Sequence, residues 1–221
     1  MIRTFLAMLA LSITFYSCDT KSGLAVENFD VVVTFYDDLA PFSTIRRYSM
    51  PDSIIVIIDS TSSESGNVTH AYDSLILAVL ENEFESIGYT REFVPSQNPP
   101  DVFVLVSVIV SNSYNATGKY GLYEYWKWYT GWTIYPSWGS GWSVRYPWQQ
   151  SEVTYNYSIG SLVIMMLDAR DANNTEMSIP NIWSGVINGL LVSDPALAQS
   201  RIVTNISQCF IQSPYLLVNS N

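Results

Sequence analysis

The stretch VFVLVSVIVS, residues 102–111, restricts the fold of this chain more than any other part. Its residues are almost all apolar, so both faces of an extended strand would have to be shielded from water. The run is short and follows the turn-forming sequence PSQNPPD, which favours a strand over a buried helix. We therefore expect a central strand that other elements cover on each side.

The clearest helix is expected over residues 69–88. Thr69 can cap its first turn, and Gly88 can end it in the left-handed conformation. The apolar residues recur at spacings of three and four, which places them in one stripe that would pack on a sheet. The stripe consists of Tyr72, Leu75, Ile76, Val79, Leu80, Phe84 and Ile87.

A second amphipathic helix is expected over residues 195–212. Asp194 can cap it, Pro195 suits its first turn, and Pro214 would stop it. Cys209 lies within the apolar pattern of this helix, so we expect a buried and inert thiol.

The order of the elements is strands, helix, strands, helix. Turn sequences join neighbouring strands, which predicts a mostly antiparallel sheet with both amphipathic helices packed on one face. The expected fold class is therefore α+β, a two-layer sandwich. The other expected strands are 29–38, one near 44–49, 54–59, 89–94, a bent or paired strand over 153–170 with Gly160 as a candidate bulge, and 182–192.

The amino-acid composition and net charge argue against some classes of binding partner. The 221 residues include 20 acidic and 10 basic side chains, giving a net charge of −10. This charge argues against binding to nucleic acid and against adhesion to anionic lipid through basic patches. Only 14% of residues are charged and 14% are aromatic, a balance that suits an exported domain rich in β-structure.

The N-terminal sequence MIRTFLAMLALSITFYSC has the pattern of a bacterial lipoprotein signal. Arg3 precedes an uncharged, mostly apolar stretch over 5–16, which is too short to span a bilayer as a helix. Ser17 and Cys18 follow, and a small residue before cysteine is typical of a lipobox. We therefore expect residues 1–17 to be a signal peptide and Cys18 to carry the lipid.

Lipidation would leave Cys18 as the first mature residue, with 18–28 as a polar tether and 29–215 as a single domain. The expected location is the bacterial cell envelope, at the outer membrane, with the lipid anchor as the contact to the membrane. The alternative is ordinary secretion with a disulfide between Cys18 and Cys209.

Residues 120–148 form an aromatic insert, which we expect to fold as a long hairpin. The segment holds six of the seven tryptophans and six of the fifteen tyrosines. Tyr and Trp side chains supply large rigid contact areas, so the insert is a candidate surface for a protein or glycan partner. Packing of the rings on each other and on the sheet, or contact with the membrane interface, are the alternatives. The candidate residues are Tyr123, Tyr125, Trp126, Trp128, Trp138 and Trp142.

Several segments in order resemble a known family. They are FSTIRRYSMPDS, ESIGYTR, NPPDVFVLVSV, IGSLVIMMLDAR and IWSGVINGLL. With the lipobox, they resemble the domain-of-unknown-function family 4136 (DUF4136), lipoproteins of Gram-negative envelopes, over residues 29–215. The resemblance implies a fold and a location but assigns no catalytic residue. Met165 and Ser184 stand where an acidic residue and an arginine are usual in the family.

The residues offer little for catalysis. The one histidine, His70, is expected as a solvated residue at the start of a helix. No Cys/His spacing suits a metal, and GSGWS at 139–143 lacks a histidine partner. Asp168, Asp171 and Asn173 resemble part of a calcium loop without its later glutamate. We expect no enzyme activity, metal or cofactor.

The sequence thus predicts an envelope-anchored lipoprotein that acts as a non-catalytic binding or assembly module. The alternative is a glycan-binding lipoprotein that uses the aromatic segment 120–148.

Overall fold

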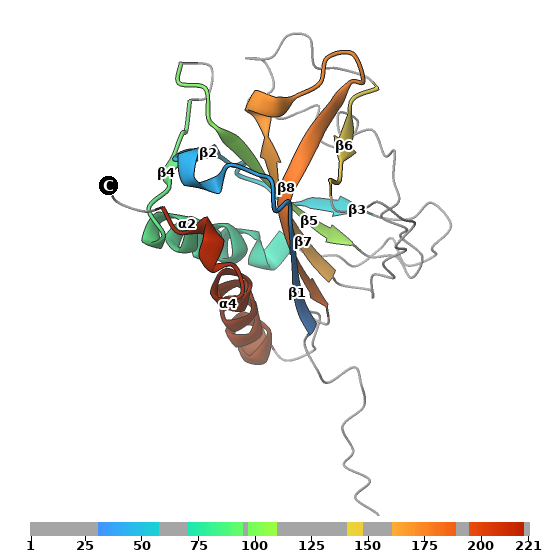
Figure 1. Ribbon diagram of the computed structural model, residues 1–221. Coiled ribbons are helices and arrows are strands. Elements are labelled where there is room, and N and C mark those ends of the chain that lie inside the picture. The colour runs from blue at the N-terminus through green and yellow to red at the C-terminus, as the bar shows by residue number, and fades with distance from the viewer. Residues whose placement is uncertain are drawn as a thin grey trace, which may run out of the picture.

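Two helices and an open sheet make up the described part of the protein, a computed structural model (Figure 1). The structure describes residues 31–57, 70–94, 97–109, 141–147, 161–188 and 195–218. The expected mixture of α and β elements is confirmed. The predicted signal peptide, Cys18 and most of residues 120–148 lie outside these ranges. Within them, no helix is long and apolar enough to cross a membrane.

The elements follow the expected chain order. The helices are α2 (Asp73–Ser86) and α4 (Pro195–Ile211), and short 3₁₀ turns are η2 (Phe42–Thr44), η3 (His70–Tyr72), η5 (Ala169–Asp171) and η6 (Pro214–Leu216). The strands are β1 (Val31–Tyr36), β2 (Arg47–Ser49), β3 (Ile55–Ile57), β4 (Thr90–Arg91), β5 (Val102–Ile109), β6 (Ser143–Arg145), β7 (Ser161–Asp168) and β8 (Ser178–Asn188).

The sheet has eight strands, in the order β1-β8-β7-β5-β2-β4, with β3 beside β5 and β6 beside β8. Its long ladders, β1–β8, β8–β7 and β7–β5, are antiparallel. The short pairings of β2, β3, β4 and β6 are parallel, which the sequence analysis did not anticipate. Parallel neighbours need a crossover connection, and α2 supplies one between β2 and β4.

Strand β5 is buried on both faces, as its sequence predicts. Val102, Val104 and Val106 belong to one core cluster, and Phe103 and Leu105 belong to another on the opposite face. All five side chains are at most 1% exposed. The neighbouring β7 is buried along its whole length, so β5 and β7 form the buried centre of the sheet.

Both helices pack into the first cluster, which we call the helix-side core, and they lie on the same side of the sheet in Figure 1. The predicted stripe of α2 supplies Ile76, Leu80 and Phe84. The Phe84 ring meets those of Trp183 and Phe210 edge-on, at centroid distances of 6.5 and 4.9 Å. These aromatic contacts tie both helices to β8.

The predicted end of the first helix and the predicted start of the second are confirmed, whereas α2 starts at Asp73, after the 3₁₀ turn η3, and not near residue 69. Gly88 follows α2 with φ of +95°, a left-handed conformation that favours glycine. Helix α4 begins at Pro195, as expected. Helix α2 begins directly after η3, and Tyr72 at its start makes no side-chain cap. The candidate caps Thr69 and Asp194 lie outside the described residues.

The second cluster, which we call the opposite core, contains Phe103, Leu105, Val163, Met165 and Trp142. Trp142 is only 3% exposed. The interpretation of this tryptophan as part of a contact surface is therefore corrected. Its ring covers the apolar face of the sheet, because burying a large aromatic area there is worth more than leaving it in water.

Gly185 allows α4 to approach β8 closely. A Cβ atom added at Gly185 would lie 3.0 Å from the Cys209 Sγ and 3.2 Å from the Trp183 ring. Cys209 is fully buried, unpaired with another cysteine, and burial raises the pKa of its thiol to about 12. The expected buried, inert thiol is thus confirmed.

Gly185→Ala is expected to lower the free energy of unfolding by about 1–3 kcal/mol, because overpacking a filled core forces neighbouring groups to move. Cys209→Ala removes the nearest obstacle, so the same change should cost about 1 kcal/mol less in that background. Urea unfolding of the wild type, both single variants and the double variant measures this difference. Additive effects would show that Cys209 is not the obstacle.

Candidate binding cleft

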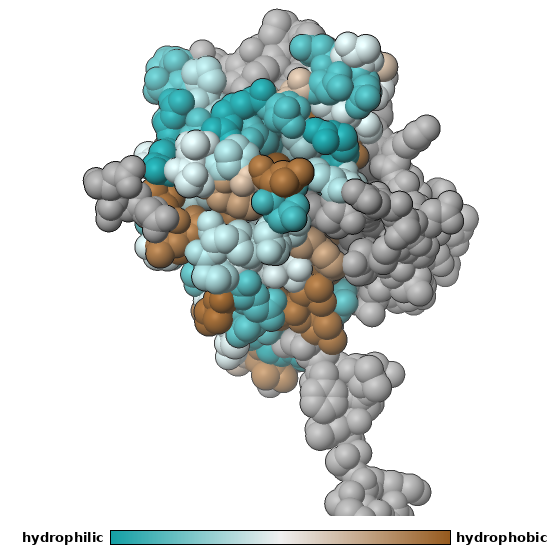
Figure 2. All heavy atoms as spheres, viewed as in Figure 1, coloured by the Kyte–Doolittle hydropathy of each residue, from teal (hydrophilic) through white to brown (hydrophobic). Residues whose placement is uncertain are grey.

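A cleft of about 590 Å³ lies at the end of the sheet where β1 and β7 finish. In the view of Figure 2, most of the coloured residues in the upper part of the molecule are hydrophilic. Hydrophobic residues gather in the lower part, around α4 and β1. The lining residues come from four segments. They are Asp37, Leu39, Ala40 and Pro41 after β1, Arg145 of β6, Asp168, Arg170 and Asp171 around η5, and Ile182 of β8.

The loop after β1 forms one wall and is held by its own backbone. The Asp37 N–H donates to the Ile182 carbonyl at 3.0 Å, which extends the β1–β8 ladder by one residue. The Asp37 Oδ1 accepts from the Leu39 N–H at 3.0 Å and so fixes the turn. Phe42, which follows the turn, is buried in the helix-side core. The wall is therefore preformed, although the Leu39 side chain at its tip is 87% exposed.

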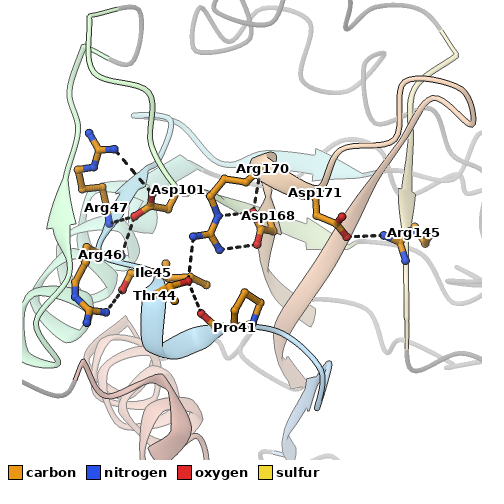
Figure 3. A network of polar contacts seen from close by, with 10 residues as sticks. All are labelled: Pro41, Thr44, Ile45, Arg46, Arg47, Asp101, Arg145, Asp168, Arg170 and Asp171. Atoms are coloured by element: carbon orange, nitrogen blue, oxygen red, sulfur yellow. Dashed lines mark hydrogen bonds and ion pairs between the residues drawn. The ribbon is translucent and has the colours of Figure 1, made fainter.

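An ion pair between Asp168 and Arg170 forms the floor (Figure 3). The Asp168 side chain is only 4% exposed. Its Oδ1 accepts from the Arg170 backbone N–H and Nε, both at 2.9 Å, and its Oδ2 accepts from Nη2 at 2.7 Å. These hydrogen bonds raise the pKa of the Arg170 guanidinium. Side-on pairing of this kind fixes both position and orientation of the guanidinium.

Thr44 connects the Arg170 guanidinium to the opposite wall. Its Oγ1 accepts from Arg170 Nη1 at 3.2 Å and donates to the Pro41 carbonyl at 2.9 Å. Figure 3 shows this chain of contacts running from η5 to η2. The floor and the β1 wall are therefore held in a fixed relation to one another.

A second ion pair forms the far side of the cleft. The Arg145 Nη2 donates to the Asp171 Oδ2 at 3.0 Å, and the two side chains are 42% and 75% exposed. Because water screens such a pair, it adds little to stability. Its charged atoms remain accessible to a ligand.

Asp101 supports the cleft from behind. Its Oδ2 accepts from the backbone N–H groups of Arg46 and Arg47, at 2.8 and 2.9 Å. Its own carbonyl accepts from the Ala169 N–H at 3.3 Å, directly before Arg170. The aspartate of NPPD thus joins β2, β5 and η5, and Figure 3 shows its contacts with Arg46 and Arg47.

The calcium-loop interpretation finds no support in the described residues, where no group of three or more acidic, His or Cys side chains is placed to hold a metal ion. Asp168 and Asp171 each face an arginine. The Asn173 Oδ1 accepts from the N–H groups of Thr175 and Glu176 and stabilises the β7–β8 turn. These residues therefore serve the turn and the cleft.

His70 lies where the sequence predicts, in η3 before α2. Its side chain is 64% exposed, and its Nδ1 lies 2.8 Å from the Asp73 Oδ2. The contact joins two consecutive turns at the start of the helix and lies apart from the cleft lining. The expectation of a solvated residue at a helix start is confirmed.

The sequence analysis and the structure place the candidate site differently. Of the six aromatic candidates only Trp142 is described, and it is buried. The other five, Tyr123, Tyr125, Trp126, Trp128 and Trp138, and the predicted lipidation site Cys18 lie outside the described residues. The cleft was not predicted. Its one local signal is the sequence Asp168-Ala-Arg170, in which the two charged residues pair.

Arg170→Met is expected to lower the free energy of unfolding by about 2–4 kcal/mol, because it leaves the buried Asp168 carboxylate without its partner. This loss of stability is smaller than for a fully buried ion pair, because the Arg170 side chain is 34% exposed. Adding Asp168→Asn should recover part of the loss. Arg145→Gln, at the exposed pair, is the matched control and should change stability by less than about 1 kcal/mol. Urea unfolding measures the wild type and these three variants, and equal losses for Arg170→Met and Arg145→Gln would contradict the assignment.

The comparisons with known proteins concern the whole domain. The model of the family described as "Domain of unknown function (DUF4136)" matches residues 32–215. A crystal structure of a DUF4136 family protein from Bacteroides thetaiotaomicron is 28% identical, with a TM-score of 0.61. The match covers 85% of this chain and 97% of that one.

Two further structures are more distant. The PelC dodecamer from Paraburkholderia phytofirmans is 11% identical, and a single-substitution variant of that dodecamer is 12% identical, each with a TM-score of 0.34. The matches cover 87% and 86% of this chain and all of the others. No curated protein matches the sequence. Because the family match covers nearly the whole described domain, the chain belongs to the DUF4136 family.

Proposed function

We propose that this protein is a lipoprotein of the bacterial envelope, anchored at the outer membrane, that acts as a non-catalytic binding or assembly module through its cleft. The observation that carries the proposal is the arrangement of the Asp168–Arg170 pair, which Thr44 and the backbone hold in one orientation. Charged groups fixed in this way at an open cleft are suited to recognition, because little conformational entropy is lost when they bind a ligand.

The pairing of the cleft charges favours binding over catalysis. A general acid or base must exchange a proton with its substrate, and so must be within reach of the reacting atom. The Asp168 carboxylate, at the floor of the cleft, accepts three hydrogen bonds from Arg170, and its side chain is only 4% exposed. Asp171 is likewise engaged by Arg145. Such groups act as fixed donors and acceptors.

The N-terminal sequence supports the proposed location. Arg3, the apolar stretch that follows it and the Ser17-Cys18 pair suit a lipoprotein signal. Membership of the DUF4136 family, which has a solved member from Bacteroides thetaiotaomicron, accords with a bacterial source. On this proposal the tether of residues 18–28 holds the domain at the membrane surface.

The finer features of the fold are part of the same proposal. We propose that the domain is a two-layer sandwich, with both helices on one face of the sheet and residues 120–148 inserted as an aromatic hairpin. The shared helix-side core of α2 and α4 supports the first feature. The alternative function is glycan binding by this insert, for which Tyr123, Tyr125, Trp126, Trp128 and Trp138 remain candidates after the correction of Trp142.

Lipidation is tested by growing expressing cells with an alkyne analogue of palmitate. The wild type is expected to be labelled and to fractionate with membranes, whereas Cys18→Ala should lose the label because no thiol remains to be alkylated. Cys209→Ala is the matched control, since Cys209 is the other cysteine of the chain, and should stay labelled. An unmodified N-terminus in protein from the soluble fraction would contradict the anchor.

Binding at the cleft is tested by photo-crosslinking in cells. A benzoylphenylalanine at Leu39, on the rim of the cleft, should give a discrete product with an envelope component, because it reacts with C–H bonds close to it. The same probe at Val203, which is 41% exposed on α4, is the control and should not give this product. The same product from both positions, or none from Leu39, would contradict a role for the cleft.

A further inference from the structure

We infer that the cleft binds a neutral, polyhydroxylated ligand, a short saccharide; this inference rests on the proposed binding function and names its ligand class. The cleft presents hydrogen-bond donors and acceptors side by side, its charges nearly cancel, and one wall is apolar. Each of these features restricts the ligand in a different way.

The donors come from the two arginines. A guanidinium has five N–H groups. Arg170 uses one each from Nε, Nη1 and Nη2 in its contacts with Asp168 and Thr44, so two remain unused among the described residues. Arg145 uses one with Asp171, so within the same part of the chain four remain unused. The remaining donors are held beside the cleft by contacts that are already made.

The acceptors come from the exposed carboxylates. One oxygen of Asp37 accepts from the Leu39 N–H, and one oxygen of Asp171 accepts from Arg145. In the part of the chain that the structure describes, the second oxygen of each carboxylate accepts no hydrogen bond and is open to a ligand. A hydroxyl group both donates and accepts, so one hydroxyl can bridge a guanidinium and a carboxylate. A row of hydroxyls matches such a surface better than groups that only donate or only accept.

The charge of the cleft disfavours ions. Its lining has three carboxylates, on Asp37, Asp168 and Asp171, and two guanidinium groups, on Arg145 and Arg170. The net charge of −1, in a chain with a net charge of −10, opposes a phosphate or a carboxylate ligand. A cation would have to approach guanidinium groups that already neutralise two of the carboxylates. A neutral ligand is repelled neither by the net negative charge nor by the guanidinium groups.

The size and the walls suit a sugar. The volume of about 590 Å³ lies within the roughly 300–1,000 Å³ of small-ligand sites. Leu39, Pro41 and Ile182 add apolar surface beside the charged groups, and a sugar ring likewise has C–H patches between its hydroxyls. A peptide would fit less well, because its backbone pairs with an open strand edge or a regular groove, and the cleft groups are side chains without such a repeat.

The experiment measures binding of named probes to the full mature chain in detergent micelles by calorimetry and saturation-transfer NMR. The neutral probes are maltotriose, cellotriose, mannotriose and N,N′,N″-triacetylchitotriose. Trigalacturonate and inorganic phosphate are the anionic probes, and a neutral Gly-Ser tetrapeptide is the peptide probe. At least one neutral trisaccharide is expected to bind, and the anionic and peptide probes are not.

The variants Arg145→Gln and Asp171→Asn locate the binding. Each removes one charge at an exposed pair while keeping a polar side chain, and each should weaken saccharide binding about tenfold or more. His70→Gln is the control, since the His70 side chain is 64% exposed, contacts Asp73 apart from the cleft lining, and this variant should bind as the wild type does. Thermal unfolding checks that all three variants fold.

The outcomes separate this inference from the proposed function. No binding of any neutral saccharide, or equal binding by wild type, Arg145→Gln and Asp171→Asn, overturns the inference. Binding of phosphate or of the peptide that depends on Arg145 and Asp171 overturns the saccharide while leaving a binding cleft in place. If no probe binds and the Leu39 crosslinks also match those of Val203, the proposed function fails as well.

Discussion

Burial of β5 and its neighbour β7 on both faces is the constraint on which the rest of the structure depends. Each face of these strands needs an apolar layer, and the helix-side core and the opposite core supply them. Charged groups are excluded from such a region, since an unpaired buried charge costs several kcal/mol. Charged side chains are therefore found at the ends of these strands, where the chain is exposed to solvent.

The cleft follows from this exclusion. Asp101 precedes the first residue of β5, Asp168 is the last residue of β7, and the two strands pair so that Val102 lies opposite Asp168. The two carboxylates therefore come together at one end of the sheet, where each accepts hydrogen bonds from backbone N–H groups. Charges that the core cannot hold are gathered where they can contact a ligand.

The sequence predicts the parts of this fold that depend on local periodicity. The apolar run of β5, the stripe of α2, the glycine after α2 and the buried Cys209 each follow from spacing or from residue type. The cleft pairs do not, because Thr44 meets Arg170 and Arg145 meets Asp171 across 126 and 26 residues. No local pattern records such pairs. Trp142 was misassigned for a related reason. A segment rich in tryptophan looks the same in sequence whether its rings lie on the surface or are buried, and Trp142 is buried.

The two departures from the family pattern lie opposite each other. Met165 of β7 and Ser184 of β8 are cross-strand partners, and both are buried, at 8% and 4% exposure. The resemblance to DUF4136 places an acidic residue and an arginine at these positions, so a usual member would bring opposite charges together there. In this chain both positions are uncharged, so neither leaves an unpaired charge buried in the sheet. The Met165 sulfur accepts a weak hydrogen bond from the Tyr146 hydroxyl at 3.6 Å, in the opposite core. Among the described residues, the ion pairs of Asp168 and Asp171 lie at the end of β7 and in η5, so recognition by charged groups is best sought in the cleft there.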